Sequence, residues 1–430
     1  MSVANVARRS MLSVAEAEKT IYQTVFPWKT ESRPLSRAVG RFLREEVRAD
    51  RDFPPFDRIT MDGIAIAYAD YEGGARRFRI AGMQPAGAPA GALEAPGDCL
   101  EVMTGAVLPR GCDCIVPVEE LGRSGETAEI KPEFRPERMQ HVHRRGSDYP
   151  AGSLLIPAGT RLSAPHIAVC AAVGRGRLLV SRDPRIALVA TGDELVEVGE
   201  PVAPHQVRIS NVYAVEAALA LHGFLDTCRF HARDEREAVK RVLAQALETF
   251  DVVVISGGVS AGKLDLVPEA LEALGVQELF HKVRQRPGLP FWFGVGPGNR
   301  PVFALPGNPV STLVCAYRYL LPYLESTLGA PPGARERALL AEDFRFEQHL
   351  TLFLPVRLER AARGEVLAYP RPVHGSGDFG GLTASDGFIE LPEGQDHFPA
   401  GSLWPLYRWS PRTLTAAGAA ELSLNAEAEA

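Results

Sequence analysis

The sequence is poor in cysteine and has no long hydrophobic run. Its six cysteines are scattered between Cys99 and Cys315 of a 430-residue chain, which excludes the dense disulfide framework of small secreted domains. No uninterrupted apolar stretch reaches the roughly 18 residues that a membrane-spanning helix needs. The first ten residues contain two arginines and are not followed by the apolar core of a signal peptide. We therefore expect a cytoplasmic protein without membrane contact.

The chain also lacks a strong excess of either charge. Its formal net charge is −6, which gives no general reason to expect nucleic-acid binding, so an anionic ligand needs a local site. Cys112 and Cys114 have no second pair at zinc-ligand spacing. The length is too great for one hydrophobic core, so we expect about two to four domains.

What the sequence does contain is a glycine-rich turn at 256–265. It follows an apolar, β-branched run at 251–255, which predicts a strand buried on both faces, and it precedes helical spacing at 266–274. A strand, a glycine turn and a helix favour an anion site, because backbone N–H groups can approach a phosphate closely there. The turn matches neither the Walker pattern nor GxGxxG, and an ordinary strand-to-helix turn is the alternative.

Strands and helices alternate through this part of the chain. Buried-strand patterns occur at 185–190, 251–255 and 302–305. Helical patterns occur at 212–221, at 235–250 and after the turn at 306–311, as far as about 327. This order predicts a doubly wound parallel sheet of about 150 residues, in which ligands bind at the carboxyl ends of the strands. The turns at 191–194, 256–265 and 306–311 are such ends, so we expect them to meet at one sheet edge.

The remaining segments have shorter elements. Ser13 and Glu16 form a capping box that predicts a helix start, and apolar spacing at 35–47 predicts a second helix. From 53 to 140, and again after 331, short strands alternate with glycine- and proline-rich turns, which predicts two β domains. We expect the last 18 residues, 413–430, to be a loose tail.

A basic segment lies between the last two strands of the predicted α/β sheet. Lys282, Arg284 and Arg286 alternate, which places them on one face of an extended chain. An edge strand protected by charge is one interpretation. We favour an anion contact, because basic clusters near phosphate sites act through charge-assisted hydrogen bonds.

Five short motifs occur in one order along the chain. They are Phe-Asp-x3-Met-Asp-Gly at 56–63, Met-Thr-Gly-Ala at 103–106, Thr-Gly-Asp-Glu-Leu at 191–195, Ser-Gly-Gly-Val-Ser at 256–260 and Leu-Pro-Gly-Asn-Pro-Val-Ser at 305–311. This ordered set resembles the molybdopterin molybdotransferase family, the molybdenum-insertion enzymes of molybdenum-cofactor biosynthesis. The same module forms the C-terminal domain of the scaffold protein gephyrin. The resemblance covers about residues 12–412.

The resemblance implies an elongated, multidomain α/β plus β protein. The implied parts are a discontinuous linker and dimerisation domain at 10–52 and 141–182, an inserted β domain at 53–140, a doubly wound parallel-sheet, molybdopterin-binding domain at 183–329 and a C-terminal β-barrel-like domain at 330–412. It also implies a homodimer whose active site lies between the α/β domain of one subunit and parts of the other. Transient contacts with the molybdopterin adenylyltransferase and with apo-molybdoenzymes are implied as well.

The reaction implied by the resemblance converts adenylylated molybdopterin and molybdate, with Mg²⁺, and releases AMP while molybdenum stays on the dithiolene. Cleaving a pyrophosphate needs a held metal ion. The acids that match the family's metal positions are Asp193, Glu194, Asp234 and Asp265. Positions that match catalytic residues are Asp62, Thr104, Glu194 and Asp265. The implied substrate-binding positions are Asp148, Thr191, Gly192, Asp193, Ser256, Gly257, Gly258, Ser260, Lys282, Arg286, Pro306, Gly307, Asn308, Pro309, Ser311 and Ser376. Lys282 and Arg286 would hold the oxyanion.

Several positions depart from the family pattern, and other functions stay open. His143 and Arg286 stand where the family often has Arg and Lys, and Leu289 replaces a further Lys. The lost charge predicts weaker or altered oxyanion binding, and molybdate and tungstate both fit such a site. One alternative is a nucleotide-pyrophosphate hydrolase or the adenylyltransferase itself, which share the α/β domain. Another is a scaffold without enzymatic activity.

Overall fold

The computed structural model describes residues 11–26, 28–259, 266–330, 335–371, 375 and 377–410. The chain divides into a large unit, made of Met1–Glu31 and Ser181–Ala430, and a small unit, Ser32–Val180. Both boundaries fall within strands β1 (Thr30–Pro34) and β12 (Arg177–Ser181). None of the helices in the described part of the chain combines the length and apolar character that a membrane span requires.

The large unit contains a six-stranded sheet that is parallel over four strands. Its order is β16 (Thr227–Ala232), β13 (Ile186–Thr191), β17 (Val252–Ser256), β21 (Arg300–Leu305), β20 (Trp292–Gly296) and β18 (Gln277–His281). The parallel part confirms the predicted α/β fold. The last two strands add an antiparallel edge that the sequence analysis did not predict, because it considered only the charged stretch between them.

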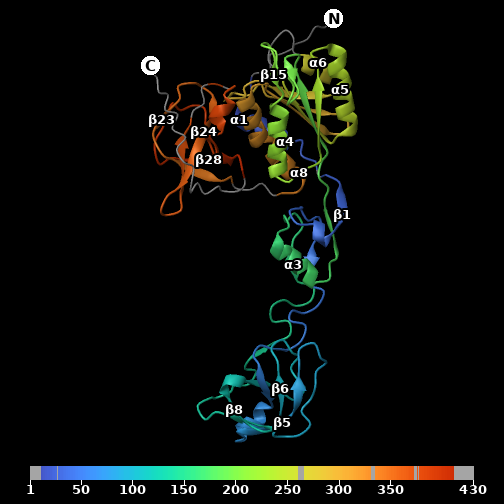
Figure 1. Cartoon of the computed structure of the whole chain (residues 1–430), viewed down its shortest axis with the longest axis vertical. Helices are drawn as coiled ribbons and strands as arrows, with labels where there is room; N and C mark the ends of the chain where they lie inside the picture. Colours follow the sequence, from blue (N-terminus) through green and yellow to red (C-terminus); the bar gives the residue numbers. More distant parts are fainter. Residues whose placement is uncertain are drawn as a thin grey trace. The chain divides into compact units, whose positions relative to one another are not determined.

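Helices cover both faces of this sheet. Helices α5 (Arg236–Thr249) and α6 (Leu266–Ala273) pack on one face, over a core that includes Val189 and Ile255. Helix α4 (Asn211–Leu221) and helix α7 (Pro309–Cys315) pack together and contact β13 and β21. Figure 1 shows α4 on the opposite side of the strands from α5 and α6. A π-helical turn (Ala316–Leu320) and α8 (Leu321–Thr327) continue α7.

A five-stranded barrel follows the sheet in sequence and belongs to the same unit. The ring runs β24 (Thr351–Arg360), β25 (Val366–Pro370), β22 (Arg337–Leu340), β28 (Leu403–Arg408), β26 (Gly387–Leu391) and back to β24. Its interior includes Leu354, Val356, Ile389 and Phe398. The predicted C-terminal β-barrel-like region is thus present. Strand β19 (Gln285–Arg286) pairs with β24 and joins this sheet from the α/β part.

Short elements complete the large unit. They are α1 (Val14–Tyr22), β14 (Leu195–Val196), β15 (Val207–Arg208), β23 (Phe344–Arg345), α9 (Phe379–Leu382) and β27 (His397–Phe398). The predicted capping box at the start of α1 is present: the Glu16 N–H donates to Ser13 Oγ at 3.2 Å, and the Ser13 N–H donates to Glu16 Oε2 at 2.8 Å.

The small unit is built around a second six-stranded sheet. Its order is β7 (Cys114–Pro117), β4 (Gly63–Ile66), β6 (Asp98–Val102), β5 (Arg77–Gln84), β9 (Thr127–Ile130) and β8 (Leu121–Ser124). Successive residues of β4 point to opposite faces. Ile64 and Ile66 join one buried cluster while Ala65 joins another, so both faces of the sheet are covered.

A third buried cluster of the small unit contains extended chain where the apolar spacing predicts a helix. The predicted helix at 35–47 is only a 3₁₀ turn (Leu35–Arg37) followed by extended chain. Gly40 has a φ of +80°, which interrupts the helix, and the Leu43 N–H donates to Thr160 O instead. The apolar residues are buried as expected, but in an extended segment. The other elements are β2 (Val47–Arg48), β3 (Arg58–Ile59), α2 (Tyr68–Glu72), 3₁₀ turn Val118–Glu120, β10 (Val142–His143), β11 (Leu154–Ile156) and α3 (Ala164–Ala172).

Candidate ligand site at the carboxyl edge of the parallel sheet

A cavity of about 560 Å³ lies where β13, β17 and β21 end. The parallel register sets Ala190 opposite Ser256 and Ser256 opposite Leu305, so the turns after these strands start at one level. The lining residues that the sequence analysis had selected are Thr191, Gly192, Glu194, Asp234, Ser256, Gly257, Gly258, Pro306, Gly307, Asn308 and Pro309. Residues from four separate turns therefore meet at one edge of the sheet, as the strand order predicts.

Two glycines let the backbone after β17 pass against the end of β13. Gly257 and Gly258 have φ angles of +100° and +66°. A Cβ on Gly257 would lie 2.8 Å from Thr191 O, and a Cβ on Gly258 would lie 2.6 Å from Val267 Cγ2. A side chain at either position would therefore clash as well as strain the backbone. This part of the cavity wall is backbone, which is what close approach to a phosphate requires.

Asp193 and Asp234 lie beside the cavity, and each carboxylate is close to the backbone N–H of the other residue. The Asp234 N–H donates to Asp193 Oδ1 at 3.1 Å, and the Asp193 N–H approaches Asp234 Oδ2 at 3.4 Å. Desolvation raises the pKa of Asp234, and the charges of Asp193 and Glu194 raise it further. His231 lies on the same edge, with Nε2 3.0 Å from Gly192 O. The pair therefore concentrates negative charge that a cation would neutralise.

Asn211 connects two of the strand-end turns, and the sequence analysis did not select it. Its Nδ2 donates to Ser256 Oγ at 2.9 Å and to Gly307 O at 2.7 Å. Among the described residues, Asn211 Oδ1 and Thr191 Oγ1 are buried and have no hydrogen-bond partner. Unsatisfied buried polar atoms are rare and call for an explanation, which a bound ligand would supply. The sequence offers one signal for Asn211, its place in the first turn of a helix. That this helix packs on β13 is known only from the structure.

A second cavity, of about 610 Å³, adjoins the first and shares Pro290 and Asn308 with it. Its lining includes the selected residues Arg286 and Ser311, and the cavity lies between the 286–290 loop and the barrel. Arg286 donates to Gln348 Oε1 at 3.0 Å. Most of the other lining residues are apolar or aromatic, including Phe344, Phe346 and Phe353 from the barrel side. Arg286 is the one charged side chain among the described lining residues.

The other two cations of the basic segment lie differently. Arg284 makes a two-pronged ion pair with Glu393, at 2.9 and 3.0 Å, so it holds the barrel rather than a ligand. Lys282 has a φ of +75°, a conformation that is uncommon outside glycine. Within the described part of the chain, Lys282 lines neither of the two cavities. Ser260, Asp265 and Ser376 lie outside the described residues.

Three selected residues belong to the small unit. The Thr104 N–H and Oγ1 both donate to Asp62 Oδ1, at 2.6 and 2.8 Å, and these bonds hold the pKa of Asp62 below its usual range. Asp148 pairs with His143 Nε2 at 2.8 Å, and His143 Nδ1 lies 3.2 Å from Arg58. Both carboxylates are exposed. Asp62 also lines a cavity of about 450 Å³ in this unit.

The acids at the sheet edge fit a magnesium ion bound together with a phosphate. Mg²⁺ prefers hard oxygen ligands and is usually held by one or two carboxylates plus substrate phosphates. Asp193 and Asp234 supply such a pair, and Glu194 lines the cavity beside it. A preformed group of three or more ligating side chains is not found among the described residues, so substrate oxygens would have to complete the coordination.

Three family models match successive parts of the chain. They are the MoeA N-terminal region (domain I and II) at 12–174, the probable molybdopterin binding domain at 187–326 and the MoeA C-terminal region (domain IV) at 337–407. Curated relatives extend over almost the whole chain. A molybdopterin molybdenumtransferase of Synechocystis sp. is 38% identical over 400 residues, which is 93% of this chain and 100% of that protein. One of Bacillus subtilis is 29% identical over 406 residues, covering 92% and 93%.

Solved protein structures also match nearly the whole chain. Two crystal structures of the molybdopterin biosynthesis MoeA protein from Pyrococcus horikoshii match with TM-scores of 0.78 and 0.76, at 29% and 26% identity. Each match covers 93% of this chain and 100% of the other. The match therefore includes both the α/β sheet and the barrel.

Proposed function

Because the chain belongs to the MoeA family of molybdopterin molybdenumtransferases, we propose that it transfers molybdenum from molybdate to adenylylated molybdopterin and releases AMP. The chain is a transferase of molybdenum-cofactor biosynthesis. The observation that carries the finer assignment is the cavity at the strand ends. There a backbone turn, the carboxylates Glu194 and Asp234 and two unsatisfied polar atoms surround one space, and Asp193 is bonded to Asp234 beside it.

The roles of the residues follow from their chemistry. Gly257 and Gly258 present backbone to the phosphates, while Thr191 Oγ1 and Asn211 Oδ1 offer hydrogen bonds to the adenylylated substrate. The matched residues Ser256 and 306–309 line the same cavity. Ser260, which lies outside the described residues, is proposed as a substrate contact from the family resemblance alone. Attack of an oxygen nucleophile at phosphorus breaks the pyrophosphate bond and frees AMP, and the molybdenum that molybdate supplies stays on the dithiolene.

A divalent cation, which we take to be Mg²⁺, would be held by Asp193, Glu194, Asp234 and Asp265. When bound, it would neutralise charge that develops on the pyrophosphate oxygens. The chain itself places two of these carboxylates at hydrogen-bond distance from each other's backbone. Because burial and like charge raise the pKa of Asp234, its carboxylate gains from a nearby cation.

We assign oxyanion binding to the second cavity, through Arg286 and Ser311. Lys282, which lines neither cavity, and Ser376, which lies outside the described residues, are proposed as further contacts from the family resemblance alone. Guanidinium groups bind tetrahedral oxyanions through charge-assisted hydrogen bonds. Leu289 lines this cavity where the family often has a Lys, so Arg286 supplies most of the positive charge there. Molybdate and tungstate remain equal candidates by size and charge.

We further propose that the protein works as a cytoplasmic homodimer with the domain limits given by the family resemblance. The inserted domain and most of the discontinuous domain (32–52 and 141–180) would then fall in the small unit, whereas residues 10–31 and 181–182 of the discontinuous domain would fall in the large unit with the α/β and barrel domains. Asp62, Thr104 and Asp148 would complete the site from the other subunit. Transient contacts with the adenylyltransferase and with apo-molybdoenzymes would deliver the substrate and take the product.

Single-turnover AMP release tests this function. The protein receives adenylylated molybdopterin and Mg²⁺, with and without molybdate, beside a Glu194→Ala variant. We expect molybdate-dependent AMP release that the variant loses. AMP release that ignores molybdate would favour the nucleotide-pyrophosphate hydrolase, and no release from a folded dimer would favour the scaffold.

A further inference from the structure

The loop that carries Arg286 is held from behind by a buried polar side chain. Gln285 is fully buried, and its Nε2 donates to Gly288 O at 3.1 Å. Gly288 has a φ of +96°, and a Cβ there would lie 2.6 Å from Gln285 Nε2 and 2.8 Å from Cys315 Sγ. The loop therefore rests directly on the Gln285 amide, with no space for adjustment.

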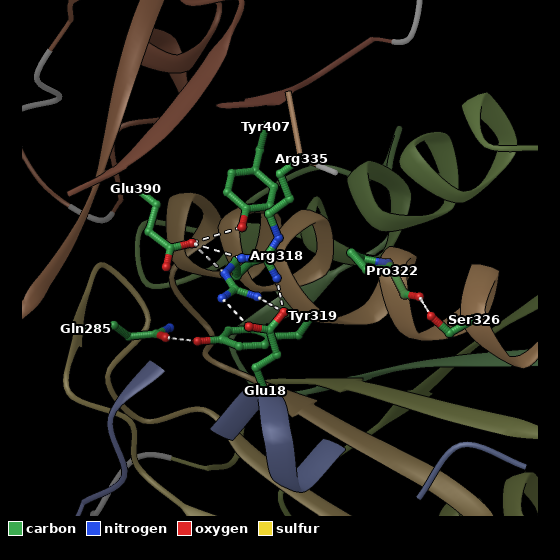
Figure 2. A network of polar contacts seen from close by, with 9 residues as sticks. All are labelled: Glu18, Gln285, Arg318, Tyr319, Pro322, Ser326, Arg335, Glu390 and Tyr407. Carbon is green, nitrogen blue, oxygen red and sulfur yellow. Dashed lines mark hydrogen bonds and ion pairs between the residues drawn. The ribbon is translucent and has the colours of Figure 1, made fainter. Parts of the chain in front are cut away.

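Gln285 is itself fixed by Tyr319. The Tyr319 hydroxyl donates to Gln285 Oε1, as Figure 2 shows, and the amide is thereby oriented with its nitrogen toward the loop. The Tyr319 ring stacks on Phe291, with centroids 4.8 Å apart, and the Phe291 N–H donates to Gly288 O at 3.1 Å. Tyr319 therefore supports both ends of the 288–291 turn: Gly288 through Gln285, and Phe291 by direct contact.

Tyr319 lies in the π-helical turn (Ala316–Leu320), whose five residues are all buried. Single π turns inside α-helices are uncommon and often mark functional sites. The neighbouring Arg318 is 2% exposed and pairs with Glu18 of α1 at 3.1 Å and with Glu390 of the barrel at 2.7 Å. These ion pairs connect the π-helical turn to α1 and to the barrel (Figure 2), and they thereby fix the position of Tyr319.

We propose that Gln285, oriented by Tyr319 of the π-helical turn, is a positioning residue that holds the 286–289 loop in the geometry that binds the oxyanion substrate. This inference rests on the oxyanion role proposed for Arg286. Tyr319 lines neither cavity. Gln285 borders the second cavity, but its side chain is fully buried, and its amide nitrogen and oxygen are engaged by Gly288 O and the Tyr319 hydroxyl. Both residues therefore act through the loop. A displacement of a binding group by about 1 Å can cost up to 100-fold in rate.

The test uses the full-length double variant Gln285→Met/Tyr319→Phe. Replacing both partners of a buried hydrogen bond by apolar groups of similar shape is close to neutral for stability, whereas removing one leaves the other unsatisfied. The double variant thus removes the bonds from Gln285 to Gly288 O and to Cys315 Sγ. Gly288 O still accepts from the Phe291 N–H, so it is not left without a partner. Tyr323→Phe is the matched control, because Tyr323 is a buried tyrosine of the same continuous helix that donates to Thr24 O instead.

Two measurements are made on the wild type, the double variant, the control and Arg286→Gln. Equilibrium dialysis gives the affinity for molybdate, and AMP release gives the molybdate dependence of turnover. We expect the double variant to bind molybdate about 10-fold more weakly, with kcat at saturating molybdate within about 2-fold of wild type. Arg286→Gln should weaken molybdate binding too, and Tyr323→Phe should change neither quantity.

The dialysis result decides the positioning role even if the proposed reaction fails. Wild-type protein that binds molybdate but releases no AMP would refute the transferase reaction and leave the comparison of affinities valid. Unchanged molybdate affinity in the double variant would overturn the inference. So would an unchanged affinity in Arg286→Gln, because the loop would then not be the oxyanion site.

Discussion

The Asn211 side-chain nitrogen lies 2.9 Å from Ser256 Oγ and donates a hydrogen bond to it. The same nitrogen donates to Gly307 O, so one amide joins the turn after β17 to the turn after β21. The amide oxygen is left buried without a partner among the described residues. Asn211 therefore fixes two walls of the cavity and keeps one acceptor for a ligand.

Replacing Asn211 by Ala should weaken substrate use more than stability. The variant loses the bridge between the two turns, and we expect kcat/KM for the adenylylated substrate to fall roughly 10-fold or more. AMP-release kinetics measure this effect. Asn299→Gly is the matched control, because Asn299 is in a surface turn at a φ of +60° that glycine accepts. Equal loss in both variants would contradict a specific role for Asn211.

Adding one methyl group at Gly258 should disrupt the turn after β17. The Cβ of Gly258→Ala would meet Val267 Cγ2 at 2.6 Å at a positive φ, so we expect a loss of about 1–3 kcal/mol in unfolding free energy and a strong loss of AMP release. Gly199→Ala is the matched control, since Gly199 has a φ of +96° and nothing within 4 Å of its Cβ position. Chemical denaturation of both variants separates the clash from backbone strain, and equal losses would contradict the contact argument.

The sequence predicts much of the site because β-branched runs followed by glycine or acidic turns mark the ends of parallel strands. Thr191, Ser256 and Pro306 were found this way, and the parallel register does bring them together. Asn211 was missed because its role depends on which helix covers β13, a tertiary fact. The helix predicted at 35–47 failed for a related reason, because apolar spacing shows burial but does not reveal that Gly40 turns the chain. The sequence predicts Arg284 as an anion contact, but in the structure its partner is Glu393, which is more than 100 residues away along the chain.

Removing the charge of Asp234 should have opposite effects without and with metal. Because the folded-state pKa of Asp234 is raised, its contribution to stability is present below the unfolded value and is lost as pH rises through the folded value. Asp234→Asn should therefore raise the melting temperature at neutral pH in EDTA. With Mg²⁺ and AMP the wild type should gain more stability than the variant. Differential scanning fluorimetry at several pH values measures both effects, and equal gains would contradict a metal role for Asp234.

Breaking the ion pairs of Arg318 should destabilise the large unit strongly. Arg318→Met removes the buried partner of Glu18 and Glu390 and leaves them only the more exposed Arg335, and removing one member of a buried pair costs about 3–5 kcal/mol. Adding Glu18→Gln and Glu390→Gln to the same protein should recover most of this loss, because the one charge left in the network is that of Arg335, which is partly exposed to solvent. Urea unfolding of the three proteins measures the difference. A single variant as stable as wild type would show that the network contributes little.

Mixed dimers of two variants should show whether Asp62 and Glu194 act in one site from two different subunits. If Asp62 of one subunit completes the site of Glu194 in the other, a heterodimer of Asp62→Ala and Glu194→Ala chains has one site with both changes and one intact site. Heterodimers isolated with two different tags should then recover about half of the wild-type AMP release, as two-fold symmetry requires. Each homodimeric variant should be inactive. If both residues serve a site within one subunit, every site of the heterodimer lacks one acid and no activity returns. Failure of the two tagged chains to co-purify would instead contradict the homodimer itself.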